Sequence, residues 1–195
     1  KSMAIGVNKP FYPINHLEGH LISPGFNNIL KFPNLSILLT GGHTQIYFIK
    51  KPNDYNLLGE TVDDAVGESF DKVAKLLCLS YPGGPEIEKF AKNGNFNAYE
   101  LPHPLKNKKN INFSFSGIKT AVNLIVKNQK KITQKFKEDM AASFQNKIVE
   151  IIINKIERAI IMLQNKNMNI ADISIVGGVA ANKALRKSLL GNNKI

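Results

Sequence analysis

The chain has 195 residues, and 43% of them are apolar, so it can bury a core in one large domain or two small ones. No run of about 18 apolar residues occurs, which excludes a membrane-spanning helix. The single cysteine, Cys78, excludes an internal disulfide and fits a reducing compartment, so we expect a cytoplasmic protein. Cys78 follows an apolar helical pattern, which predicts a buried structural thiol.

The charge of the chain is uneven. Lys and Arg total 26 against 15 Asp and Glu, a net charge of +11, and nine lysines but no acid lie between Lys106 and Lys137. This excess predicts a polyanionic partner such as a nucleic acid. A second interpretation stays open. Lys, Asn and Ile have A/T-rich codons, so a biased genome would raise the lysine content without any selection for nucleic acid.

The first predicted elements are a helical piece and a pair of strands. Residues 1–6 are typical of part of a helix. An apolar run at Leu35–Thr40 ends in Gly41-Gly42, and residues 45–49 then alternate in polarity. This pattern predicts a strand, a tight turn and a second strand.

Two helices are predicted next. Asp63 or Asp64 is placed to cap the first, and a turn at 82–85 starts the second, with Pro85 at its first position. The apolar stripe of the first helix is Val66, Phe70, Val73, Ala74 and Leu77.

The second half of the chain also alternates between strands and helices. Its longest predicted helix has an apolar residue at nearly every fourth position from Phe136 to Leu163. The other predicted elements are a short strand at Phe113–Ser116, a helix from Gly117 to about Asn128, a buried strand at Asp172–Val176, a turn at Gly177-Gly178 and a helix at Ala180–Leu190. The class is therefore α/β.

His16 and His20 are spaced i, i+4, so on a helix they share one face and could bind one metal ion. A chance or capping pair has the same spacing. Glu18 lies two residues from His16, roughly 200° around a helix, and so points away from that face. This argues against a zinc hydrolase of the H-E-x-x-H kind, whose glutamate acts beside the metal.

Two glycine pairs are candidates for ligand contact. Thr40-Gly41-Gly42 lies between strands, where backbone N–H groups can approach an anion, although an ordinary hairpin turn has the same sequence. Gly177-Gly178 precedes a helix, whose N-terminus favours a phosphate or a sugar edge; close packing of helix and strand is the alternative.

An acidic row is expected on the helix that follows the first strands. Asp64, Glu68 and Asp71 share one face, and their charges repel unless a cation, a sugar hydroxyl or water screens them. Asp71 and Glu88 are candidates for contacts with ribose or other hydroxyls, because a carboxylate accepts two such hydrogen bonds at once.

Six phrases carry a family resemblance. They are NHLEGH at Asn15–His20, LLTGGHTQ at Leu38–Gln45, GETVDDAVGESFDKVAKLL at Gly59–Leu77, YPGGP at Tyr81–Pro85, FSFSGIKT at Phe113–Thr120 and IVGGVAAN at Ile175–Asn182. In sequence, order and spacing the chain resembles the bacterial TsaD family, also known by the old label O-sialoglycoprotein endopeptidase.

The resemblance implies an actin/hexokinase/Hsp70-like (ASKHA) fold of two ribonuclease-H-like lobes. Residues 1–34 would end the first lobe, and residues 35–195 would form most of the second, so this chain would be an inactive piece of a longer protein. The implied activity is transfer of a threonylcarbamoyl group from threonylcarbamoyl-adenylate to N6 of adenosine 37, in tRNAs that read codons beginning with A.

The resemblance also assigns residues and partners. His16 and His20 would hold a divalent metal, Fe²⁺ or alternatively Zn²⁺, with a third ligand, an aspartate, beyond Ile195. A paralogous TsaB-like subunit and a TsaE-like ATPase would assist. The implied donor-binding positions are Leu38, Leu39, Thr40, Gly41, Gly42, Asp71, Gly84, Glu88 and Asn182, where Glu88 replaces the aspartate of many members.

Two other functions remain open at this point. One is an ATP-dependent small-molecule kinase or carbamoyltransferase on the same fold, against which the histidine pair and the basic segment favour tRNA. The other is a non-catalytic nucleotide-binding module. No Ser–His–Asp or Cys–His set is evident, so direct transfer without a covalent enzyme intermediate is expected.

Overall fold

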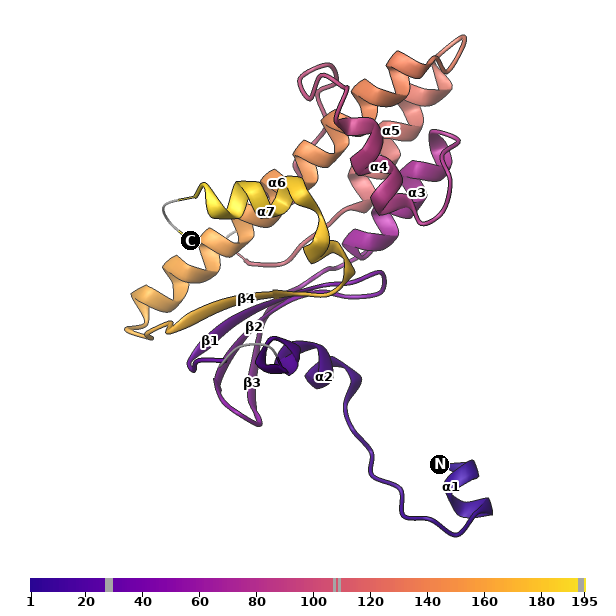
Figure 1. The fold of residues 1–195 in the computed structure, drawn as a ribbon. Helices are drawn as coiled ribbons and strands as arrows, with labels where there is room; N and C mark the ends of the chain where they lie inside the picture. The colour runs from indigo at the N-terminus through magenta and orange to yellow at the C-terminus, as the bar shows by residue number, and fades with distance from the viewer. Residues whose placement is uncertain (27–29, 107, 109, 193–194) are drawn as a thin grey trace.

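A computed structural model describes residues 1–26, 30–106, 108, 110–192 and 195. Its centre is a four-stranded sheet in the order β3-β2-β1-β4 (Figure 1). β1 (Asn34–Leu39) pairs antiparallel with β2 (Thr44–Lys51), which pairs antiparallel with β3 (Asp54–Glu60). β4 (Asp172–Val176), from far along the chain, pairs parallel with β1. The mixed α/β class predicted from the sequence is confirmed.

β1 contributes to an apolar cluster on each face of the sheet, because successive side chains of a strand point to opposite sides. Leu35, Ile37 and Leu39 join the main apolar core. Leu38 joins a smaller cluster with Leu21 from α2 (His16–Ile22). All six residues of β1 are buried, and its two polar side chains, Asn34 and Ser36, accept hydrogen bonds from Ser174 Oγ of β4.

The helices of the core side form one layer over the sheet and a second group beyond it (Figure 1). α6 (Gln134–Asn165) runs through both, and its predicted apolar positions from Phe136 to Leu163 are buried. The other helices are α3 (Val66–Leu76), α4 (Gly83–Ala91), α5 (Ser116–Lys127), α7 (Lys183–Leu190) and the 3₁₀ turns η1 (Ser23–Phe26) and η2 (Gly178–Ala181). Among the described residues no helix is both long and apolar enough to cross a membrane.

The first helix lies apart from this body. α1 (Ser2–Gly6) confirms the helical piece predicted at the start of the chain, and an extended segment separates it from α2 (Figure 1). None of its residues is buried, and Met3 and Ile5 are 79% and 69% exposed. α2, in contrast, packs on the sheet through Leu21.

Three local predictions are wrong. Neither Asp63 nor Asp64 caps α3, whose N-cap is Ala65 without a side-chain hydrogen bond, because Asp63 binds the start of α5 instead. Cys78 is exposed: α3 ends at Leu76, and Cys78 turns away from the core with a φ of 53°. Residues 113–116 form only an isolated bridge between Phe113 and Thr61.

Two element boundaries also differ from the prediction. α4 begins at Gly83, with Pro82 as its N-cap, so Pro85 is the third residue and not the first. The helix predicted at 180–190 is divided into η2 and α7, because the side chain of Asn182 accepts a hydrogen bond from Leu185 N and starts a new helix there.

Candidate nucleotide site

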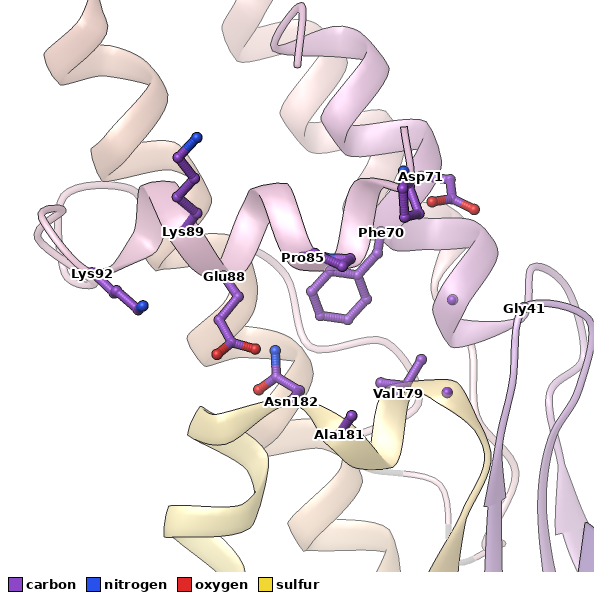
Figure 2. Close-up of a pocket in the computed structure, with 14 residues that line it drawn as sticks. Gly41, Phe70, Asp71, Pro85, Glu88, Lys89, Lys92, Val179, Ala181 and Asn182 are labelled. Carbon is purple, nitrogen blue, oxygen red and sulfur yellow. The ribbon is translucent and has the colours of Figure 1, made fainter. Parts of the chain in front are cut away.

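A cavity of about 440 Å³ lies where the loops after β1 and β4 meet α3 and α4 (Figure 2). β1 and β4 are parallel, so their carboxyl ends open at the same edge of the sheet, the usual place for ligands in such folds. The residues that line the cavity are Gly41, Gly67, Phe70, Asp71, Pro82, Gly84, Pro85, Glu88, Lys89, Lys92, Gly178, Val179, Ala181 and Asn182.

One wall is formed where α3 begins against the turn after β1. Gly67 N donates to Thr40 O at 3.2 Å, and Val66 N donates to the buried Thr44 Oγ1 at 2.8 Å. A Cβ on Gly67 would lie 2.8 Å from Thr40 O and from Gly41 Cα. Only glycine therefore allows the start of α3 to lie this close to the turn.

A second wall is fixed by Asp71. Its Oδ1 accepts a 2.7 Å hydrogen bond from Gly83 N, the first residue of α4. A Cβ on Gly83 would lie 2.7 Å from Asp71 Cα, so this close packing of α3 and α4 also requires glycine. Asp71 thus joins two helices and is one of the residues that line the cavity.

The third wall is the loop from β4 to α7. Gly177 has a φ of +98°, a backbone conformation that glycine adopts readily. A Cβ at this position would lie 2.4 Å from Leu39 O. Asn182 is 8% exposed, and its Nδ2 donates to Gln145 Oε1 at 2.9 Å. Glu88 Oε2 accepts from Lys183 N at 3.3 Å, which brings Glu88 and Asn182 together at the start of α7 (Figure 2).

Five of the nine predicted donor-binding residues therefore line one cavity: Gly41, Asp71, Gly84, Glu88 and Asn182. Leu38 and Leu39 do not, because their side chains are buried in the two apolar clusters on opposite faces of β1.

The remaining two, Thr40 and Gly42, build the turn itself. Thr40 Oγ1 accepts from His43 N at 2.9 Å and from Gly42 N at 3.3 Å. The Gly42 N–H, which the sequence suggested for an anion, is engaged within the turn.

The chain matches the family model TsaD, described as tRNA N6-adenosine threonylcarbamoyltransferase, over residues 1–194. It belongs to the TsaD family. Curated relatives with that name include one from Pelagibacter ubique, 49% identical over 190 residues, and one from Rickettsia rickettsii, 47% identical over 191 residues. The matches cover 97% of this chain but 53% and 56% of the relatives, so the chain spans about half their length.

A solved structure supports the fold. Component A of (R)-2-hydroxyglutaryl-CoA dehydratase from Acidaminococcus fermentans is 16% identical, with a TM-score of 0.55 over 96% of this chain and 61% of its own. The TsaD-family chain thus has the α/β fold of the actin/hexokinase/Hsp70-like class, of which it contains a part.

His16 and His20 lie on α2, across the sheet from the cavity helices (Figure 1). Their ring centroids are 4.6 Å apart. Two ring nitrogens bound to one tetrahedral ion lie roughly 3.4 Å apart, a separation that rings at this distance can reach by turning, so the spacing of the pair is compatible with one shared ion. Within the described part of the chain no third His, Cys, Asp or Glu completes a group. Leu17 and Leu21 pack α2 near Leu38 and Val176, at the same sheet edge as the cavity.

Sequence reasoning did not single out several lining residues of the TsaD-family cavity. Phe70 was placed in the core, where its ring does pack edge-on against Phe144 at 5.2 Å, but it also faces the cavity beside Pro85 (Figure 2). Lys89 and Lys92 add positive charge to the α4 side. The helical spacing of Glu88 and Lys92, which are four residues apart, could have indicated that both side chains lie on the same face of α4.

Two acids of the predicted row, Asp64 just before α3 and Glu68 within it, are paired with a lysine of the protein itself. Lys72 Nζ lies 2.7 Å from Asp64 Oδ1 and 2.8 Å from Glu68 Oε1, so a lysine is the cation that the spacing required. Of the three acids in the row, only Asp71 lines the cavity.

Proposed function

We propose that the full-length protein transfers a threonylcarbamoyl group from threonylcarbamoyl-adenylate to N6 of adenosine 37, in tRNAs that read codons beginning with A. The observation that carries this proposal is the family match over residues 1–194. The gathering of Gly41, Asp71, Gly84, Glu88 and Asn182 around one cavity supports it further.

The cavity suits the adenylate part of the donor. Its volume, about 440 Å³, falls within the usual range for small-molecule sites. Phe70, Pro85 and Val179 offer apolar contact to a base, and the carboxylates of Asp71 and Glu88 can accept from ribose hydroxyls. In the reaction the amine of the adenosine forms a bond to the donor carbonyl carbon, the bond from that carbon to the phosphate oxygen breaks, and the amine loses a proton.

This chain contributes chiefly binding and positioning. An exocyclic amine is a weak nucleophile, so holding it against the donor carbonyl supplies much of the rate. His16 and His20 would hold a divalent metal, Fe²⁺ or alternatively Zn²⁺, with an aspartate beyond Ile195 as third ligand. Such an ion supplies Lewis-acid polarisation of the donor when bound.

The basic segment Lys106–Lys137 would bind the phosphates of tRNA. Lys127, Lys130 and Lys131 are exposed around the turn between α5 and α6, where they are available to a polyanion. We further propose that residues 1–34 belong to the first lobe, that a TsaB-like subunit and a TsaE-like ATPase assist, and that the reaction takes place in the cytoplasm.

The test is direct assay of the full-length protein with these partners, threonylcarbamoyl-adenylate and an unmodified tRNA that reads an A-initial codon. Mass spectrometry of the digested tRNA should reveal threonylcarbamoyl-adenosine. Turnover of a peptide or sugar substrate with the tRNA left unmodified would contradict the proposal.

A further inference from the structure

A second hollow, of about 300 Å³, shares Asp71 with the nucleotide cavity. We name it the Tyr81 hollow. It lies between the end of α3 and the start of α4 and is lined by Asp71, Lys72, Lys75, Leu79, Ser80, Tyr81 and Gly83. Asp71 is the one predicted donor-binding residue among those that line the hollow, so the function proposed above assigns no role to the other lining residues.

Tyr81 presents a large aromatic surface to solvent. It is 84% exposed, although the turn that carries it is held at both ends. Leu79 N donates to Ala74 O at 2.9 Å, and Gly83 N donates to Asp71 Oδ1 at 2.7 Å. An exposed ring on a turn fixed in this way is a ready platform for stacking of another flat ring.

Positive charge accompanies this ring. Lys72 is neutralised by Asp64 and Glu68, but Lys75 is exposed and forms no salt bridge with any described residue. Lys137 Nζ of α6 donates to Cys78 O at 3.4 Å, which brings the end of the basic segment beside the hollow. An exposed aromatic ring beside unneutralised positive charge, here that of Lys75 and Lys137, is the combination that binds single-stranded nucleic acid.

We propose that the Tyr81 hollow binds one unpaired nucleotide of the tRNA, with its base stacked on Tyr81 and its phosphate near Lys75. The inference rests on the proposed function and assigns a new site to the RNA. Because Asp71 is a wall of both the hollow and the cavity, a nucleotide held here would be a close neighbour of the adenosine that receives the group.

The test uses the full-length protein with its partners and an anticodon stem-loop RNA that carries fluorescent 2-aminopurine at one unpaired position at a time. Stacking quenches this base, so one position should be quenched by the wild type and by Tyr81→Phe, which keeps the ring. Tyr81→Ala should abolish the quenching and weaken RNA binding roughly tenfold or more. AMP binding in the cavity should stay unchanged.

A second pair of variants tests the phosphate contact. Lys75→Gln should lower the salt dependence of RNA binding by about one unit of log–log slope. Lys166→Gln, at an exposed lysine at the far end of α6, should leave it unchanged.

The possible results distinguish failure of the nucleotide site from failure of the proposed function. RNA binding with the same quenching in Tyr81→Ala would overturn the nucleotide site while leaving the proposed function intact. Hydroxyl-radical oxidation measures whether Tyr81 is accessible. Protection of Tyr81 by AMP alone would make the hollow a mononucleotide site and would overturn the inference. Protection of Tyr81 in the RNA-free protein would overturn it as well. A wild type that binds no RNA would overturn the proposed function and the inference together.

Discussion

Asp63 connects the loop before α3 to the start of α5 through one carboxylate. It accepts from Phe115 N at 2.8 Å, Ser116 N at 3.3 Å, Ser116 Oγ at 2.8 Å and Ser114 Oγ at 2.5 Å. Partial burial acts to raise the pKa of Asp63, but these hydrogen bonds outweigh it and hold the pKa below its ordinary value of 3.8. The loop that leads into the cavity wall thus depends on an ionised Asp63.

The pH dependence follows from this lowered pKa. A carboxylate with a depressed folded-state pKa stabilises the fold above its unfolded pKa, and that stability is lost as the pH falls through the folded value. Asp63→Asn should therefore cost about 1–2 kcal/mol at neutral pH, and the difference from wild type should begin to shrink near the ordinary pKa of 3.8 and disappear below the lowered folded-state pKa.

Urea unfolding of full-length protein from neutral pH down to about pH 2 measures this effect. Asp54→Asn is the control, because the side chain of Asp54, the first residue of β3, accepts a 3.3 Å hydrogen bond from its near neighbour Asn56. A pH-independent difference between Asp63→Asn and wild type would contradict the account.

At the scale of elements, α2 presents both histidines from one face. His16→Ala and His20→Ala should each lower the metal content of the full-length protein strongly, since either change leaves at most one ligand on this helix. The melting temperature should change little, because the buried residue of α2 is Leu21. Elemental analysis beside thermal melting checks both expectations. His43→Ala, at an exposed histidine outside α2, is the control, and full metal occupancy in the double variant would contradict the assignment.

Two cations of α6 hold a basic loop through the carbonyls of Leu105, Lys106, Lys108 and Asn110. Lys155 is completely buried, and its Nζ donates to Leu105 O and Asn110 O at 3.3 Å each. Arg158 donates to the carbonyls of Lys106 and Lys108. Burial lowers the pKa of Lys155 below 10.5, and the nearby Arg158 lowers it further. An ammonium group in this place costs free energy that the hydrogen bonds to the loop carbonyls offset.

Removing this buried charge should free the loop without unfolding the protein. Lys155→Met keeps the apolar stem but loses both hydrogen bonds, so tryptic cleavage after Lys106 and Lys108 should become several-fold faster at nearly constant melting temperature. Timed proteolysis of full-length protein with mass spectrometry measures the rate, with Lys166→Met as control. An unchanged cleavage rate would show that Lys155 does not hold the loop.

The regular elements could be predicted wherever a sequence period was strong, as along α6 and β1. β3 was not predicted, because its edge sequence is polar, Leu57 is exposed and the pairing with β2 is irregular next to Tyr47 and Lys51. Cys78 was misplaced because nothing in the apolar spacing marks the end of α3 at Leu76.

The candidate site, too, could be predicted only in part. Glycines and acids in fixed phrases pointed to the cavity through the family resemblance. The long-range contacts, in contrast, are not revealed by any local pattern. Asp63 accepts from Phe115 N, 52 positions away, and Asn182 donates to Gln145, 37 positions away.

At the scale of the whole molecule, the net charge of +11 predicts salt-sensitive binding of tRNA. Replacing Lys127, Lys130 and Lys131 by Gln in the full-length protein should flatten the dependence of log Kd on log salt by roughly 0.7–0.9 for each phosphate that the variant no longer neutralises. The control replaces Lys50, Lys51 and Lys166, which are exposed elsewhere. Equal slopes for the two triple variants would assign the lysine-rich segment to compositional bias.

We propose above that the cavity between α3, α4 and the loop after β4 holds the donor. Gly84 lines it, and a Cβ on Gly84 meets no atom within 4 Å, so a larger side chain there fills the cavity without a backbone clash. The decisive measurement is mass spectrometry of tRNA after reaction with full-length wild type, Gly84→Ala and Gly84→Leu. We expect a graded loss of threonylcarbamoyl-adenosine, slight for alanine and at least tenfold for leucine, at equal melting temperature and tRNA affinity. Wild-type modification by Gly84→Leu would contradict this proposal.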